Sequence, residues 1–211
     1  MGKLTKFLKK TWHFIWHEDS LLSWIVNIIL AFVLIKFIVY PGLGLVLGTS
    51  HPIVAVVSSS MEHHQQFDEW WASRALCESG ACNQGQFYAK YNVTKEDFQK
   101  YPFAKGFNIG DIMFLRKADP KSVKMGDIIV FRSPYRSDPI IHRVIKKWTD
   151  GNIYYFRTKG DNNAGHVQDE LQITEAQLVG KTLFRVPYLG YVKIGFVKFL
   201  CVFGKFNFCV R

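Results

Sequence analysis

The sequence contains few cysteines, and their spacing is not typical of a metal site. Only four of its 211 residues are cysteines. Cys77 and Cys82 are five positions apart and Cys201 and Cys209 eight apart, and neither pair has a second Cys/His pair at ligand spacing. We therefore expect no metal and no cofactor. Cys77 and Cys82 could form a disulfide bond in an oxidising compartment, or both could remain free thiols.

The sequence also lacks a base-stacking motif, although its formal net charge is +10. Its basic residues flank or interrupt apolar segments, a pattern typical of membrane orientation and of contact with anionic lipid. Those flanking residues are Lys3, Lys6, Lys9 and Lys10 near the N-terminus and Lys193, Lys198 and Lys205 near the C-terminus. We therefore predict membrane lipid as a partner and exclude nucleic acid.

One segment is long and apolar enough to cross a membrane. Residues 21–40 read LLSWIVNIILAFVLIKFIVY, with Lys36 as the one charged residue. About twenty such residues match the hydrocarbon thickness at a helical rise of about 1.5 Å per residue. Pro41 and Gly42 are expected to end the helix. Because no small-x-small cleavage site follows Tyr40, we favour an uncleaved anchor over a signal peptide.

The charges beside this segment predict its direction. The four N-terminal lysines favour a cytoplasmic N-terminus, which places the polar part of the chain on the outer face. We therefore predict a single-pass protein of the cell membrane with an extracytoplasmic domain. Asn92-Val93-Thr94 is a glycosylation sequon on that same side.

Downstream of the span, short β-branched and apolar segments alternate with turn signals. This pattern is typical of a mainly β domain, folded or barrel-like. The segments that look like strands are residues 51–58, 109–115, 125–132, 140–145 and 152–158.

We divide the chain into four parts. They are a basic cytoplasmic N-terminus (1–20), a transmembrane helix (21–40), an extracytoplasmic domain (41–193), and an apolar, basic tail that is interfacial or membrane-associated (194–211). Within the domain, residues 62–108 read as a small helical insertion, with helices expected at 67–76 and 94–101 capped by Asp68 and Thr94. The insertion could cover a site or contact a partner, although a packed surface excursion is the plainer interpretation.

Three side chains in this domain suggest nucleophilic catalysis. A serine hydroxyl needs a nearby base, which histidine can supply, and the histidine needs an acceptor that holds its tautomer. Ser60, His142 and an acidic residue between Asp161 and Glu170 occur in that order. Each also has a simpler explanation, since serine runs occur in loops, strand histidines are commonly structural, and Gly-Asp-Asn-Asn forms turns. Other histidines that could serve as base are His51, His63, His64 and His166.

Together these motifs resemble the type I signal peptidases of the archaeal and endoplasmic-reticulum kind. The resemblance implies a signal-peptidase-like β domain and covers nearly all of the chain except the insertion and the extreme tail. It lies in residues 47–61, 110–111, 126–131, 140–145, 158–163 and 186–191. The bacterial members use lysine as base, whereas His142 corresponds to the histidine of the other group. A Ser/Lys dyad is therefore disfavoured.

The resemblance implies a role for each matching position. Ser60 would be the nucleophile, His142 the general base, and the Ser58 hydroxyl would help the Ser60 amide to hold the oxyanion. The family usually has a second aspartate about six residues after the one that matches Asp161. Position 167 is valine, so a loop lengthened by two residues would make Asp169 the partner of His142, with Asp161 and Glu170 as alternatives. Ser59 replaces the usual glycine, which would cause strain if that position needs a positive φ.

The implied function is removal of signal peptides from exported preproteins by cleavage after small residues. Expected partners are preprotein signal peptides, membrane lipid and the protein-export channel. Two alternatives remain: a catalytically silent, membrane-anchored relative that binds export partners, or a related membrane serine protease with another substrate.

Overall fold

The computed structural model describes residues 2–78, 80–192 and 195. It divides into two compact units, residues 1–46 and 47–211. The first unit is helical, and the second is mainly β-sheet with several short helices. The predicted interfacial tail, residues 194–211, lies outside the described residues except for Gly195.

The first unit begins with α1 (Lys3–His17) and continues with α2 (Leu21–Leu34), the π-helical turn η1 (Ile35–Val39) and α3 (Tyr40–Leu47). The Ser20 side chain caps α2 by accepting a hydrogen bond from the backbone N–H of Ser23. Two polar side chains of α2 bond to the end of α1. Ser23 Oγ donates to the carbonyl of Phe14 (2.8 Å), and Asn27 Nδ2 donates to that of Ile15 (3.0 Å).

The apolar helix is longer than the sequence predicted. It runs without a break over Leu21–Leu47, 27 residues that contain an 18-residue stretch with a mean hydropathy of 2.5, and by length and composition it can cross a membrane. The expectation that Pro41 and Gly42 end the helix was wrong. A π-helical turn, Ile35–Val39, lies directly before α3 and shifts the hydrogen-bond partners by one residue. Pro41 then sits in the first turn of α3, where a missing backbone donor is tolerated best.

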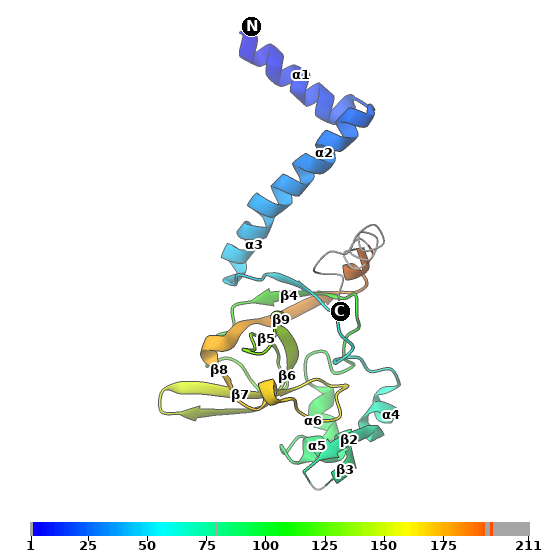
Figure 1. Ribbon diagram of the computed structural model, residues 1–211, viewed down its shortest axis with the longest axis vertical. Coiled ribbons are helices and arrows are strands. Elements are labelled where there is room, and N and C mark those ends of the chain that lie inside the picture. The colour runs from blue at the N-terminus through cyan, green and yellow to red at the C-terminus, as the bar shows by residue number, and fades with distance from the viewer. Residues whose placement is uncertain (1, 79, 193–194, 196–211) are drawn as a thin grey trace. The chain divides into compact units, whose positions relative to one another are not determined.

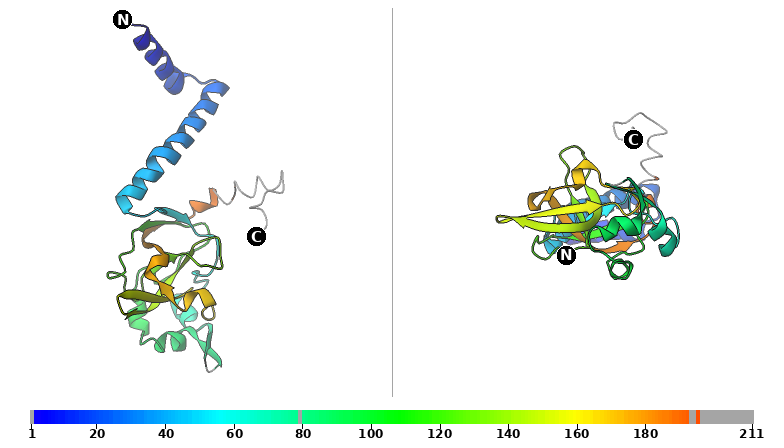
Figure 2. Two further views of the ribbon diagram at one scale, coloured as in Figure 1. Left: turned by 60° about the vertical axis from the view of Figure 1, so that its left-hand side comes forward. Right: turned by 90° about the horizontal axis from the view of Figure 1, so that it is seen from below.

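The second unit is built on a curled, seven-stranded sheet in the order β1-β4-β9-β5-β6-β7-β8 (Figure 1). All of its pairings are antiparallel, which confirms the predicted mainly β fold. The long β6–β7 hairpin projects from the sheet (Figure 2). The strands are β1 (Ile53–Ala55), β4 (Ile112–Arg116), β5 (Ile128–Phe131), β6 (Ile140–Asp150), β7 (Ile153–Lys159), β8 (Ile173–Thr174) and β9 (Leu178–Val186). Two short 3-10 helices, η2 (Gln168–Glu170) and η3 (Glu175–Gln177), flank β8.

Strand β5 is buried on both faces and divides the core into two clusters. Successive side chains of a strand point to opposite faces. Ile129 and Phe131 pack with Phe156 in one cluster, whereas Ile128 and Val130 pack in the other cluster, which contains Met113 and Met61. A continuous apolar strand is therefore required at this position.

Two Gly-Asp pairs, Gly110-Asp111 and Gly126-Asp127, form equivalent turns that are tied to β9. Gly110 and Gly126 both have φ of +86°, a conformation that favours glycine. Each following aspartate accepts the backbone N–H three residues earlier, from Asn108 to Asp111 and from Lys124 to Asp127. Arg185 and Lys181 of β9 then form ion pairs with Asp111 and Asp127.

The insertion, residues 62–108, is a mixed α/β element with its own aromatic core. It contains α4 (Phe67–Ala72), β2 (Arg74–Cys77), β3 (Gly80–Asn83), α5 (Gln84–Ala89) and α6 (Lys95–Gln99), which gather at one place in Figure 1. The Cys77–Cys82 disulfide closes the β2–β3 hairpin. The core residues of the insertion are Trp70, Ala75, Cys77, Phe87, Tyr88, Val93 and Phe98, packed with Ile145 of β6.

The predicted helices of the insertion are only partly correct. Thr94 caps α6 as expected, through a reciprocal capping box with Asp97. The helix expected at 67–76 ends at Ala72, because Arg74–Cys77 pairs with β3, and Gln66 rather than Asp68 is its N-cap. Helix α5 and strand β9 were not predicted.

Phe98 is the residue whose loss should damage the insertion most. Its ring is fully buried and contacts Trp70, Trp71 and Tyr88. We expect Phe98→Ala to lower the free energy of unfolding by about 3–5 kcal/mol, because it leaves a cavity. Denaturant unfolding of the detergent-solubilised chain measures this change. Leu76→Ala, at a residue of the same insertion that is 58% exposed, is the control and should change stability much less.

Candidate active site

Ser60 lies in the loop after β1, and this loop is anchored on two sides. The next residue, Met61, is 1% exposed within the core. The carbonyl of Ser60 accepts a hydrogen bond from the backbone N–H of Asn162 (2.8 Å), and the Asn162 side chain donates to the carbonyl of Ser59 (3.1 Å). The serine is therefore held against the Gly-Asp-Asn-Asn turn, which is distant in sequence.

His142 lies on β6, opposite Ile129 of β5. Strand alternation places it on the same face as Ile140 and Val144, which belong to the apolar core. Its ring is buried, and Nε2 lies 2.9 Å from Oγ of Ser60. The structure therefore brings together the serine and the histidine that the sequence singled out.

Glu170 is the acidic residue that contacts His142. Its Oε1 lies within hydrogen-bond distance of the His142 Nδ1, and Glu170 is fully buried at the end of η2. The second carboxylate oxygen, Oε2, accepts the backbone N–H of Val167 (2.9 Å). A carboxylate on Nδ1 favours the tautomer in which Nε2 is free to accept a proton from Ser60.

A second hydroxyl lies beside Ser60. Oγ of Ser58 is 3.1 Å from Oγ of Ser60, and Ser58 is exposed. Ser59, where the related enzymes usually have glycine, is not among the described residues with positive φ. The serine at this position therefore causes no left-handed backbone strain.

A cavity of about 530 Å³ opens beside Ser58. It lies between β1 and the β5–β6 connection. Because β1 is the last strand of its sheet, an extended peptide could pair with its free edge. The lining residues are Ala55, Val57, Ser58, Tyr135, Arg136, Ser137, Asp138, Pro139, Ile140 and Ile141.

Similarity to known proteins agrees with this geometry. No protein-family model matches the chain. The SEC11 catalytic subunit of the signal peptidase complex from Scheffersomyces stipitis is 29% identical over 167 residues, 75% of this chain and 73% of the relative. The corresponding subunit from Colletotrichum graminicola is 26% identical over 164 residues, 75% and 71% of the two chains. The one from Zygosaccharomyces rouxii is 37% identical over 98 residues, 42% and 56%. Over about three quarters of its length, the chain is therefore similar to SEC11 catalytic subunits of signal peptidase complexes.

The similarity to SEC11 subunits supports a serine protease. The expected partner of the histidine, however, must be corrected. Asp169 does not contact His142. Its Oδ2 accepts a hydrogen bond from Ser133 Oγ (2.7 Å) and pairs with Nε of Arg136 (3.2 Å). Both acids lie in the 3-10 helix η2, where successive side chains point about 120° apart, so only Glu170 faces the ring.

Asp161, the other predicted alternative, belongs to a buried network beside the serine and the histidine. Arg143 donates to both of its carboxylate oxygens (2.9 and 2.7 Å), and Tyr88 and His63 of the insertion lie 3.2 Å from them. Burial alone would raise the pKa of Asp161, but the Arg143 guanidinium and these hydrogen bonds hold it well below its usual range. Asp161 therefore stays ionised and fully paired.

Sequence reasoning missed the roles of Arg143 and of the insertion in this network. Arg143 is fully buried, and its remaining N–H groups donate to the carbonyls of Pro102, Phe103 and Gly126. The available signal was an arginine next to His142 within the otherwise apolar stretch Ile140–Ile145, since a buried charge requires a partner. Nothing in the insertion sequence indicated that Tyr88 would reach Asp161.

Lys159 is buried in the same region without contacting Ser60. Its ammonium donates to Oε1 of Gln84 (2.8 Å) and to the carbonyls of Gly160 and Asp161 (3.0 and 3.2 Å). Among the described residues, the side-chain partners of the Ser60 hydroxyl are His142 and Ser58. This arrangement does not favour the Ser/Lys alternative.

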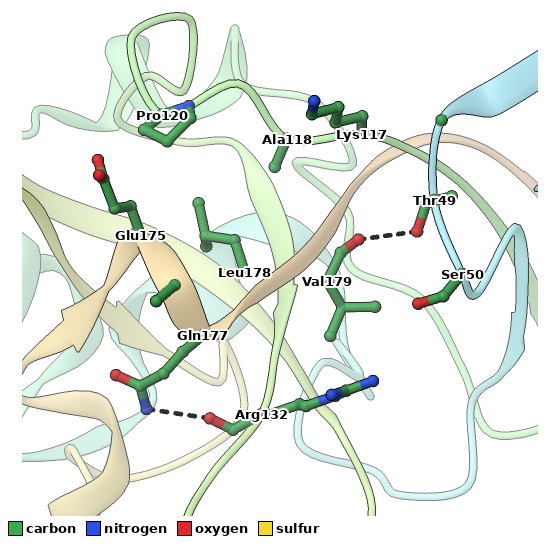
Figure 3. Close-up of a pocket in the computed structure, with 12 residues that line it drawn as sticks. Thr49, Ser50, Lys117, Ala118, Pro120, Arg132, Glu175, Gln177, Leu178 and Val179 are labelled. Carbon is green, nitrogen blue, oxygen red and sulfur yellow. Dashed lines mark hydrogen bonds between the residues drawn. The ribbon is translucent and has the colours of Figure 1, made fainter.

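Another cavity of this unit, about 540 Å³, lies apart from these groups (Figure 3). Thr49 donates to the carbonyl of Val179 (2.8 Å) at one side of it, and Lys117 and Arg132 also line it. Ser60, His142 and Glu170 do not line this cavity. We assign it no part in the chemistry of Ser60.

Lys159 gives a stability test that depends on pH. Burial lowers the pKa of Lys159 to about 8, whereas an unfolded lysine titrates near 10.4. Between these values the unfolded chain binds more protons, so stability must rise with pH. We expect wild type to gain about 2 kcal/mol relative to Lys159→Met between pH 7 and 9.5, measured by denaturant unfolding. An unchanged difference between the two proteins over this range would contradict the lowered pKa of Lys159 in the folded state.

Proposed function

We propose that this chain is a membrane-anchored serine endopeptidase that removes N-terminal signal peptides from exported preproteins, cutting after small residues. The observation that carries the proposal is the continuous contact from Ser60 Oγ to His142 Nε2 and from His142 Nδ1 to the buried Glu170 carboxylate. The SEC11 relatives, named as signal peptidase complex catalytic subunits, support the substrate class.

In the proposed mechanism Ser60 attacks the scissile carbonyl while His142 accepts its proton. Glu170 holds the ring with Nε2 toward the serine and stabilises the imidazolium that forms. The Ser58 hydroxyl and the Ser60 backbone N–H hold the oxyanion, and one such donor contributes roughly 3 kcal/mol of transition-state stabilisation. His142 then protonates the leaving amine, and water releases the acyl-enzyme by the same route.

We further propose that the substrate binds as an extended strand at the free edge of β1. Alternate side chains would then enter the cavity beside Ser58, which is lined in part by apolar side chains and would admit small residues. The apolar Val57 and Ile141 support this arrangement, because both line the cavity close to Ser58.

The helix Leu21–Leu47 is consistent with membrane anchoring. We propose that the N-terminus is cytoplasmic, that the second unit lies on the opposite side, and that lipid and the protein-export channel are neighbours. The names of the relatives support assembly into a signal peptidase complex. Since the chain resembles the archaeal and endoplasmic-reticulum group, we place it in the membrane across which preproteins pass, which is the endoplasmic reticulum in cells that have one. This replaces the more specific prediction of the cell membrane.

The catalytic assignment predicts the effect of removing either reacting group. Ser60→Ala and His142→Ala should each reduce preprotein cleavage by at least about 1000-fold, because the two groups act as a unit. Membranes containing the full-length chain and a radiolabelled preprotein provide the measurement. Survival of cleavage in both variants would refute the assignment. Absence of cleavage in wild type would favour a silent binding relative, and cuts without small residues at the first and third preceding positions would favour another protease.

Adjacent acids provide a matched pair that tests the role of Glu170. Glu170→Gln should lower kcat by about 100- to 10,000-fold, because the amide no longer stabilises the imidazolium or enforces the tautomer. Asp169→Asn, one residue away, should leave kcat within about threefold, since Asp169 binds Ser133 and Arg136 rather than His142. The reverse ranking of the two variants in single-turnover kinetics would restore Asp169 as the histidine partner.

A further inference from the structure

The insertion presents an exposed asparagine within the only Asn-x-Ser/Thr triplet of the sequence, Asn92-Val93-Thr94. Asn92 lies in the turn after α5 with a φ of +56°, a conformation that asparagine adopts more readily than most residues. Its side chain takes part in none of the hydrogen bonds found among residues 2–78, 80–192 and 195. Val93, by contrast, is 3% exposed, so the triplet is fixed to the core while its asparagine faces outward.

Asn92 also stands at an open cavity of about 500 Å³ with an aromatic wall. The cavity includes Trp71, whose indole packs so closely on Gly85 that a Cβ there would lie 2.4 Å from Nε1. A sugar ring has an apolar face that can pack on an indole, and its hydroxyls need polar neighbours such as Thr94 and Lys95. The lining residues are Trp71, Gly85, Ala89, Asn92, Val93, Thr94 and Lys95.

The same insertion contains the Cys77–Cys82 disulfide. Disulfide bonds persist in the oxidising compartments to which secreted proteins are delivered, and asparagine-linked glycans are added in the same secretory route. The cysteine pair and the sequon are therefore two independent chemical signs of one compartment. The N-terminal lysines predict that compartment for the domain as well.

We propose that Asn92 is a site of asparagine-linked glycosylation and that the first sugar of the glycan occupies the cavity beside Trp71. In the transfer, Nδ2 of Asn92 forms a bond to C1 of a sugar on a polyprenyl-diphosphate oligosaccharide. The bond from C1 to the diphosphate oxygen breaks, the lipid diphosphate leaves with the electron pair, and the amide loses one proton. The modification adds bulk to the insertion at the turn after α5, which is distant from Ser60 in sequence.

The attachment is tested with the full-length chain produced in yeast. Wild type should migrate as one larger species that peptide N-glycosidase F converts to the unmodified mobility. Asn92→Gln and Thr94→Ala should abolish the shift, whereas Thr94→Ser retains both the sequon and the hydroxyl that caps α6. An unshifted wild type, or a shift that persists in Asn92→Gln, would overturn the proposal.

The place of the first sugar is tested by trimming the purified glycoprotein in two ways. Endoglycosidase H leaves one sugar on Asn92, whereas peptide N-glycosidase F removes it and converts the residue to aspartate. We expect a higher thermal midpoint for the endoglycosidase H product than for Asn92→Asp, which reproduces the fully deglycosylated chain. Equal midpoints would refute binding of the first sugar beside Trp71. The mobility experiment would still decide whether Asn92 is glycosylated.

Discussion

The Arg143–Asp161 ion pair is the interaction on which the arrangement around Ser60 depends. Both side chains are fully buried, and removing two charges from water costs several kcal/mol per ion unless every group finds a partner. Asp161 receives hydrogen bonds from Arg143, Tyr88 and His63, and the guanidinium also binds three backbone carbonyls. The pair therefore joins β6, the Gly-Asp-Asn-Asn turn and the insertion at one point.

This junction determines the position of the proposed catalytic groups through the neighbouring residues. Arg143 follows His142 on β6, and Asp161 follows Gly160. A Cβ on Gly160 would lie 2.8 Å from Nε2 of His142 and 2.9 Å from the carbonyl of Ser60, so the backbone must approach both groups closely. Two residues of the insertion also bond to this region. Trp70 donates to the carbonyl of Asp161, and Gln84 bonds to Lys159 and to the carbonyl of Asn163. The insertion is therefore more than a surface excursion.

Some elements followed from local pattern alone, and others did not. The apolar span and the buried strand β5 were predictable because each is an almost continuous run of apolar residues of the length that its element requires. The helix end at Pro41 was not, since the π-helical turn before it depends on backbone hydrogen bonding rather than on side-chain type. Arg74–Cys77 is a strand because it pairs with Gly80–Asn83, to which the disulfide joins it. Strand β9 lies between β4 and β5 in the sheet, so its extended conformation depends on pairing with strands that are distant in sequence.

The sequence by itself determined the family resemblance, the mainly β class, the long apolar helix and the choice of Ser60 and His142 as candidate catalytic residues, because these depend on residue type, order and period. Only the tertiary structure decided which acid meets the histidine. Asp169 and Glu170 are neighbours with the same chemistry, and a 3-10 turn directs one toward Arg136 and the other toward His142. It also decided that Tyr88 and Trp70 would support Asp161, because a buried charge recruits its partners from whatever segment folds against it.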